Sequence, residues 1–328
     1  MRFRSTRPRR PALAGKAALV LAWLFALFAL PGAAHAQTCT FSVGYTDFGT
    51  IDMLDTEPAD VVGAVIIHCS GYTTPMLRLC LNIDATKERK LLGPSGATLN
   101  YNLFVDPDHV SVWGSVLTPN TVPYILDLPV HPSGNVWAQE PFYGRIPPRQ
   151  PAPPGTYTMT FSAAETYFVY VGYSGTAPEC STATSPYKSA PFNVTATVGT
   201  DCNIVATPLS FGETTSLTQA LMATSSVTVT CVSGAPYTVM LDAGTTQGAT
   251  VAARKLARVE GGDETIDYQI FYDPARAEIW GDGTNGTSVA KNVGTGSAQS
   301  FTLYGEVFPQ QIGAAGHYHD TVTATIVF

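Results

Sequence analysis

The sequence is poor in charged residues, and what it lacks excludes several classes of protein. Charged side chains make up 13% of the 328 residues. Acidic residues outnumber basic ones 25 to 18, so the positive charge that attracts nucleic acid or an anionic lipid surface is missing. No apolar run after residue 30 is long enough to span a bilayer. No segment keeps a helical apolar period, so the sequence predicts few helices.

The first residues are expected to form a secretory signal peptide, residues 1–36. A basic head precedes the apolar run AALVLAWLFALFAL, and Ala34-His35-Ala36 is a typical cleavage site. The pair Arg9-Arg10 leaves the twin-arginine route as an alternative to ordinary secretion. Cleavage would remove six basic residues and leave 12 basic against 25 acidic ones, a net charge of −13.

The remaining chain contains short alternating segments between Gly, Pro, Asn and Asp clusters, and it repeats itself. Alternation of this kind is typical of all-β sandwiches or barrels. Phe48-Gly49 follows one cysteine by nine residues, and Phe211-Gly212 follows another by nine. The segment NYNLFVDPDHVSVWG aligns with DYQIFYDPARAEIWG. The sequence therefore predicts two copies of one β-domain, an N-terminal one at 37–199 and a C-terminal one at 200–328.

The repeat also constrains the disulfides. Two cysteine pairs have nearly equal spacings of 30 and 29 residues, and a secreted chain favours disulfides. If the copies fold alike, these pairs are equivalent bridges, and the remaining two cysteines form a bridge found only in the first copy. The predicted bridges are Cys39–Cys69, Cys202–Cys231 and Cys80–Cys180.

The two copies differ at their ends. The first copy continues into PFNVTATV, an alternating segment that is a plausible final strand, whereas the second reaches Phe328 ten residues after Tyr318. We expect the second domain to expose an unpaired edge that accepts a strand from a partner. An edge capped by an internal loop, or a truncated sequence, is the alternative. The candidate residues of the donor-strand groove are Ile204, Leu209, Val322, Ile326 and Phe328.

These landmarks resemble the spore coat U domain family, which also provides the subunits of archaic (Csu-type) chaperone–usher pili. The resemblance is carried by the Cys and Phe-Gly spacing, by Tyr…Asp-Pro…Trp-Gly and by Tyr-Gly…Gly-x-Tyr. It implies two immunoglobulin-like β-sandwich domains, the second lacking its last strand. It also implies secretion through the periplasm, a periplasmic chaperone, an outer-membrane usher and an adjacent pilin subunit as partners. A two-domain member is similar to the tip adhesin, which attaches cells to surfaces and supports biofilm formation.

The N-terminal residues are consistent with a position at the tip of a pilus. Cleavage after residue 36 would leave two residues before Cys39, too few to donate a strand at about 3.3 Å per residue. A subunit that only accepts a strand is expected at one end of a fibre, with the first domain pointing outward. A secreted coat or matrix protein that assembles by strand exchange is the alternative function. A secreted carbohydrate-binding or enzymatic sandwich is a third.

The binding surface is expected at the end of the first domain that faces away from the second. Apolar loops there are predicted to contact a hydrophobic surface or an unknown receptor. The segment 122–130 is the best single candidate, although an ordinary buried strand is an open alternative for it. The candidate surface residues are Tyr72, Val122, Tyr124, Ile125, Leu126, Leu128, Tyr167, Phe168 and Tyr170.

No motif predicts catalysis. The sequence has no GxSxG, no CxxC and no Gly-rich loop opening a helix. His317 and His319 lie two residues apart without an evident third ligand, which favours a solvent-facing pair over a metal site. Asp106 and Asp273 each precede a proline at matching places of the two copies, and this recurrence favours a turn. We expect no enzyme activity, cofactor, metal or nucleic-acid partner.

Overall fold

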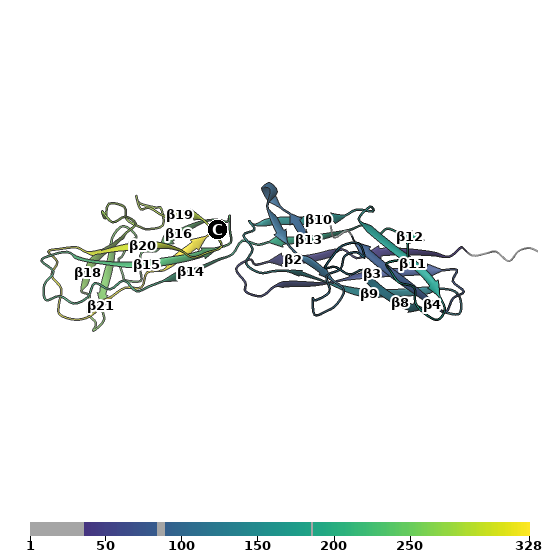
Figure 1. The fold of residues 1–328 in the computed structure, drawn as a ribbon. Helices are drawn as coiled ribbons and strands as arrows, with labels where there is room; N and C mark the ends of the chain where they lie inside the picture. The colour runs from purple at the N-terminus through teal and green to yellow at the C-terminus, as the bar shows by residue number, and fades with distance from the viewer. Residues whose placement is uncertain (1–35, 84–88, 185) are drawn as a thin grey trace, which may run out of the picture.

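The structure is a computed structural model that describes residues 36–83, 89–184 and 186–328. The predicted signal peptide lies outside these residues except for Ala36. Figure 1 shows two β-rich bodies that follow one another along a common axis. We call residues 36–199 domain 1 and residues 200–328 domain 2.

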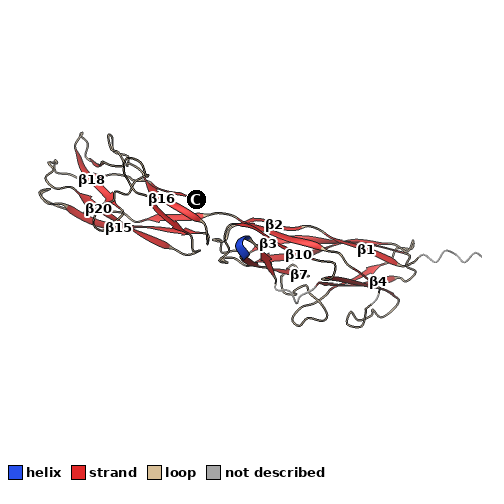
Figure 2. Cartoon of the chain, turned by 90° about the horizontal axis from the view of Figure 1, so that it is seen from above, coloured by secondary structure: helices blue, strands red, loops and turns tan. Residues whose placement is uncertain are grey.

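Strands dominate both domains, as Figure 2 shows. The helical content of the described residues is a single 3-10 turn at Pro94–Gly96. None of the described helices has the length and apolar character needed to cross a membrane. The strands of domain 1 are β1 (Thr38–Val43), β2 (Thr46–Ile51), β3 (Ala59–Ser70), β4 (Met76–Ile83), β5 (Lys90–Leu92), β6 (Thr98–Asn100), β7 (Asn102–Phe104), β8 (Tyr124–Pro129), β9 (Val136–Ile146), β10 (Gly155–Phe161), β11 (Thr166–Tyr173), β12 (Tyr187–Lys188) and β13 (Phe192–Val198).

Domain 1 contains three groups of paired strands around one core. Their orders are β1-β3-β9-β7, β2-β13-β10-β5-β6 and β12-β11-β4-β8. Alternation along the strands sends one set of side chains inward, and Trp113 is completely buried at the centre. The Trp113 indole N–H donates a hydrogen bond to the carbonyl of Leu81 at 2.8 Å, which satisfies its polar group inside the core.

Domain 2 repeats this plan with fewer strands. They are β14 (Cys202–Ala206), β15 (Leu221–Cys231), β16 (Pro236–Leu241), β17 (Arg254–Arg258), β18 (Thr265–Phe271), β19 (Ala290–Val293), β20 (Gln299–Val307), β21 (Tyr318–His319) and β22 (Ala324–Val327). Their orders are β14-β15-β20-β18-β17-β21 and β19-β16-β22. Trp280 is the buried counterpart of Trp113 and donates to the Val239 carbonyl at 3.1 Å. The predicted all-β fold with two sandwich domains is confirmed.

The predicted disulfides are confirmed as well. Cys39–Cys69 joins the paired strands β1 and β3, and Cys202–Cys231 joins the equivalent strands β14 and β15. Cys80–Cys180 links β4 to the loop that follows β11. All six cysteines are paired.

The recurring Asp-Pro pairs form turns, as predicted. The Asp106 carboxylate accepts hydrogen bonds from the backbone N–H groups of Val110 and Ser111. The Asp273 carboxylate does the same for Ala277 and Glu278. These bonds hold the pKa of both exposed carboxyls below the ordinary value.

The two domains meet through the turn between β15 and β16. Val232 and Ala235 of this turn are fully buried and belong to the same hydrophobic cluster as the core of domain 1. Gly234 at the tip of the turn has φ +79°, and a Cβ there would come within 3.0 Å of the Pro153 ring. The turn therefore fits closely against the base of domain 1.

Candidate functional site

Strand β13 of domain 1 defines the feature that distinguishes the two domains. It lies between β10, with which it pairs antiparallel from Gly155↔Val198 to Phe161↔Phe192, and β2, with which it pairs parallel. Its inward side chains are Phe192, Val194, Ala196 and Val198, and all are buried. The Phe192 ring stacks on Phe161 with centroids 4.6 Å apart. β13 therefore closes one side of the domain 1 core.

The equivalent place in domain 2 has no strand among the described residues. There β21 pairs only with β17, and β22 pairs only with β16, so both are edge strands. The segment 209–214, which corresponds to β2, has no strand conformation. We call 209–214 together with β21 and β22 the acceptor edge. The backbone of 209–214 and of β21 is left without the neighbour that β13 provides in domain 1, and β22 lacks the neighbour that β12 provides to its counterpart β11.

The acceptor edge nevertheless keeps the local shape of its domain 1 counterpart. The register of β2 against β13 shifts at Phe48-Gly49, where Gly49 has φ +70°. Gly212 has φ +74° although no strand pairs with its segment. Only glycine adopts this conformation without strain, so the Phe-Gly pair gives both segments the same left-handed backbone at the glycine. In domain 2 this conformation is present although none of the described strands pairs with 209–214.

The predicted groove residues lie along this edge with partial exposure. Phe211 packs over Gly305, where a Cβ would come within 2.9 Å of its ring. Leu209 covers the same glycine. Val322 and Ile326 pack against the core from the other side, also only partly buried. Ile204 lies in β14 beside β22, and Phe328 is half exposed. Their apolar surface is less covered than that of their domain 1 equivalents.

A carboxylate interrupts the apolar character of the edge. Asp320 occupies the position of the inward-facing Met159 of β10. It accepts hydrogen bonds from the backbone N–H groups of Thr245 and Thr246 and from the Tyr268 hydroxyl, the last at 2.9 Å. Burial, this hydrogen bond and the nearby charge raise the pKa of Tyr268. Asp320 thereby fixes the loop around 244–246 to the acceptor edge.

Arg254 lies in the core of domain 2. It is completely buried and donates hydrogen bonds to the carbonyls of Leu241, Asp242 and Trp280. Burial lowers the pKa of its guanidinium. Its bonds join β16, β17 and the Trp280 turn, so it has a structural role there.

The structure corrects part of the predicted binding surface. Tyr72, Phe168 and Tyr170 are buried in the core of domain 1 rather than exposed in loops. Phe168 and Tyr170 lie in strand β11, which pairs along its whole length with β4. Phe41 packs edge-on against Phe168, with centroids 5.4 Å apart. Phe168 and Tyr170 face the core, whereas Tyr167, Val171 and Tyr173 on the opposite face are partly exposed.

The prediction of an apolar loop at 122–130 is also wrong. Residues 124–129 form β8, an edge strand paired with β4. Tyr124, Leu126 and Leu128 point toward the core, and burial raises the pKa of Tyr124 to about 12. Ile125 on the outward face is 45% exposed, and Val122 before the strand is 39% exposed. The alternation with a period of two residues therefore marks a half-buried strand.

The end of domain 1 that faces away from domain 2 is formed by other loops. The N–H of Tyr72 donates to the Gly134 carbonyl, and the N–H of Val130 donates to the Pro75 carbonyl. These bonds tie residues 71–75 to residues 130–135, and the loop after β11 carries Cys180 next to them. We call this region the distal end. In Figure 1 it is the end of domain 1 near the labels β4 and β12, away from domain 2.

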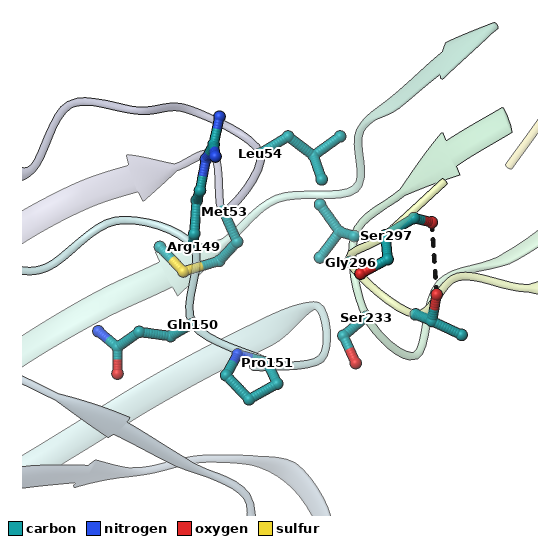
Figure 3. A pocket seen from close by; sticks show the side chains of 10 residues that line it. Met53, Leu54, Arg149, Gln150, Pro151, Ser233, Gly296 and Ser297 are labelled. Carbon is teal, nitrogen blue, oxygen red and sulfur yellow. Dashed lines mark hydrogen bonds between the residues drawn. The ribbon is translucent and has the colours of Figure 1, made fainter. Parts of the chain in front are cut away.

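The described residues contain no group of three or more side chains that could hold a metal ion. His317 and His319 are both exposed, and the N–H of His317 donates to the Glu260 carboxylate. Two cavities, of about 200 and 410 Å³, lie at the junction between the domains. Figure 3 shows the smaller one, with Met53, Leu54 and Arg149 facing Ser233 and Ser297. These cavities are packing gaps between the base of domain 1 and the first strands of domain 2.

The chain is thus a protein of two β-sandwich domains, and the second domain has an unpaired edge. A profile of the Spore Coat Protein U domain family matches residues 24–164 and 188–325. The chain belongs to this family, and the resemblance found in the sequence is confirmed. No curated protein sequence matches the chain.

The fold is shared with a solved structure of a tip adhesion subunit. The chain is similar to the CsuC–CsuE chaperone–tip adhesion subunit pre-assembly complex from archaic chaperone–usher Csu pili of Acinetobacter baumannii, with 20% identity and a TM-score of 0.50. That match covers 89% of this chain and 100% of the other. The CupB6 tip adhesin from Pseudomonas aeruginosa matches with 12% identity and a TM-score of 0.37, over 89% of this chain and 93% of the other.

Proposed function

We propose that the protein is the tip adhesin of an archaic chaperone–usher pilus, which accepts a donor strand at the acceptor edge of domain 2 and presents domain 1 outward. The observation that carries this proposal is that segment 209–214, with its left-handed Gly212, and edge strand β21 both lack a neighbour, whereas β13 lies between their counterparts in domain 1. An unpaired edge next to partly exposed apolar side chains is a hazard unless a partner occupies it. Membership of the family and the fold shared with a tip adhesion subunit support it.

Domain 1 provides a template for the donor. Its β13 runs parallel to β2 and antiparallel to β10. A donor with the same register would run parallel to 209–214, with inward residues opposite Val322, Asp320 and Tyr318. The residue opposite Asp320 would be small or polar, because a large apolar side chain there would cover a carboxylate. The residue opposite Val322 would be large, since Val322 and Leu303 replace Phe161 and Phe142 of domain 1.

The direction of the donor sets the direction of assembly. In domain 1 the chain leaves β13 at the base and enters domain 2 immediately. A donor parallel to 209–214 would leave domain 2 at the end away from domain 1, so the donating subunit would follow domain 2 as domain 2 follows domain 1. This arrangement leaves the distal end of domain 1 free. A chaperone would occupy the same edge in the periplasm, before the usher exports the subunit.

The donor-strand proposal is tested by extending the mature chain. A short Gly/Ser linker and the β13-like segment FNSTATV would be added after Phe328, with Ser at the position opposite Asp320. The extension should raise the melting temperature of domain 2, because it supplies three inward apolar side chains and a row of backbone hydrogen bonds. The matched control carries Asp in place of the Phe and the Ala of the added segment. Equal melting temperatures for the extension and its control would contradict the proposal.

Surface attachment is proposed to use the outward apolar side chains of domain 1 that the structure leaves exposed. Of the predicted set these are Val122 and Ile125. The double variant Val122→Ser, Ile125→Ser should reduce adsorption of the mature protein to polystyrene. Leu92→Ser should not, because Leu92, although 60% exposed, lies at the base. Unchanged adsorption of the double variant, or equal loss in the control, would remove these residues from the attachment surface.

A further inference from the structure

A row of three exposed side chains crosses the outer face of domain 1 near the distal end. Thr40 on β1 lies directly opposite His68 on β3, and His68 lies directly opposite Trp137 on β9. All three point to solvent, and Trp137 is 70% exposed. Directly opposed residues on one face of a sheet have Cβ atoms about 4.5–5.5 Å apart, so the three side chains form one contiguous row.

The next row on the same face is also exposed and uncharged. Ser42 lies opposite Ile66, which lies opposite Gln139. We call these residues together with the first row the Trp137 patch: Thr40, Ser42, Ile66, His68, Trp137 and Gln139. It combines one large flat aromatic ring with hydroxyl, amide and imidazole groups and has no carboxylate, lysine or arginine.

The repeat shows that the same row has different surroundings in domain 2. The counterparts of Thr40, His68 and Trp137 are Asn203, Thr230 and Ala298. All three line the larger junction cavity, where residues from the base of domain 1 face them. In domain 2 the row therefore borders the junction with domain 1 and has a small residue at the third position, while Asn203 and Ala298 stay exposed. In domain 1 the same row faces solvent, and the small residue is replaced by tryptophan.

We propose that the Trp137 patch is a binding site for a neutral saccharide. The face of a pyranose ring with axial C–H groups stacks on a flat indole, and its hydroxyls exchange hydrogen bonds with groups in the plane around it. Thr40, His68 and Gln139 supply such donors and acceptors beside the ring. The absence of charge in the patch favours a neutral sugar over a charged one. Trp is also the side chain that most often dominates a binding surface when it is exposed.

The chain offers a direct spectroscopic test. Of its four tryptophans, Trp23 belongs to the predicted signal peptide, and Trp113 and Trp280 are fully buried. Acrylamide quenching of the mature protein therefore reports on Trp137. The probes are maltohexaose, cellohexaose, mannohexaose and chitohexaose at millimolar concentration. At least one should shift the emission and protect Trp137 from acrylamide, and the same sugar on a resin should retain the protein.

Variants distinguish stacking of the sugar on Trp137 from non-specific contact with any exposed aromatic ring. Trp137→Ala should lower the affinity for that sugar at least tenfold, Trp137→Phe should retain most of it, and His68→Ala should lower it several-fold. Tyr45→Ala is the matched control, since Tyr45 is similarly exposed but lies outside the patch, and it should leave the affinity unchanged. Protection by none of the four sugars, or an unchanged affinity in Trp137→Ala, overturns the proposal. The assay needs neither a donor strand nor a pilus, so its failure is distinct from failure of the proposed function.

Discussion

Replacing Phe192 with alanine tests whether β13 holds domain 1 together as the donor model requires. Phe192 is buried and stacks on Phe161 at 4.6 Å and on Trp113 at 6.2 Å. Removing a buried Phe side chain costs about 3–5 kcal/mol of the free energy of unfolding. For a domain of this size each kcal/mol lowers the melting temperature by about 2–4 °C. The domain 1 transition should therefore fall by roughly 6–20 °C.

Differential scanning calorimetry of the mature chain measures this shift. Asn193→Ala is the matched control, since Asn193 is the exposed neighbour on the same strand and should change stability by about 0.5 kcal/mol or less. A shift for Phe192→Ala no larger than that of the control would refute the reasoning. β13 would then contribute little to domain 1, and it would not be a template for a donor in domain 2.

Three further predictions concern the rest of the fold. Replacing Cys80 and Cys180 with serine should lower the free energy of unfolding by about 2–5 kcal/mol, measured by denaturant titration. Arg254→Met should cost at least about 3 kcal/mol, seen in the domain 2 transition, because the buried carbonyls of Leu241 and Trp280 and the partly buried carbonyl of Asp242 lose their donor. Hydrogen bonds from Arg78 lower the pKa of Asp127 in the folded state. The Arg78–Asp127 pair therefore contributes its full amount to the free energy of unfolding above about pH 4, and this amount is lost as the pH falls through the folded-state pKa of Asp127. The variant Asp127→Asn should lose less free energy of unfolding than wild type between pH 5 and 2.

Each of these three predictions can be contradicted by a stated measurement. Lys255→Met removes an exposed ion pair next to Arg254 and should change stability by about 1 kcal/mol or less, so equal effects of the two variants would contradict the structural role of Arg254. An unchanged unfolding midpoint in the cysteine variant would mean that the loop after β11 is held by other contacts. Parallel pH profiles for wild type and Asp127→Asn would exclude the Arg78–Asp127 pair as a source of acid sensitivity.

The repeat made much of this fold predictable. Matched spacings between the two copies identified the disulfides and the Asp-Pro turns, because equal spacing in one order implies equal folding. The segment 122–130 was harder to interpret. Its apolar residues alternate, but a short alternating run between prolines is compatible with a loop insertion as well as with a half-buried strand. Pairing with β4 decides between them, and pairing partners far apart in sequence are not visible in local composition.

Trp137 was missed for a related reason. In VWAQEPF both phases of the alternation contain apolar residues, so the sequence does not show which side faces the core. The register against β3 places Val136 and Phe142 inward and leaves Trp137 outward, opposite His68. A signal was available in the repeat, because the alignment puts Trp137 against Ala298. A bulky residue in one copy at the place of a small one in the other marks a site where the two domains differ in their surroundings.

The link between the domains shows how a second subunit would follow the first. The N–H of Gly199, just after β13, donates to the Ile51 carbonyl at the end of β2. Two residues later Asp201 accepts from the Val232 N–H of domain 2. The strand that completes domain 1 thus leads into the next domain with almost no free linker, and the β15–β16 turn packs against the base it has just left. A donor at the acceptor edge with the same register would hold its own domain against domain 2 in the same way. The junction inside this chain would then have the geometry of the proposed junction between subunits.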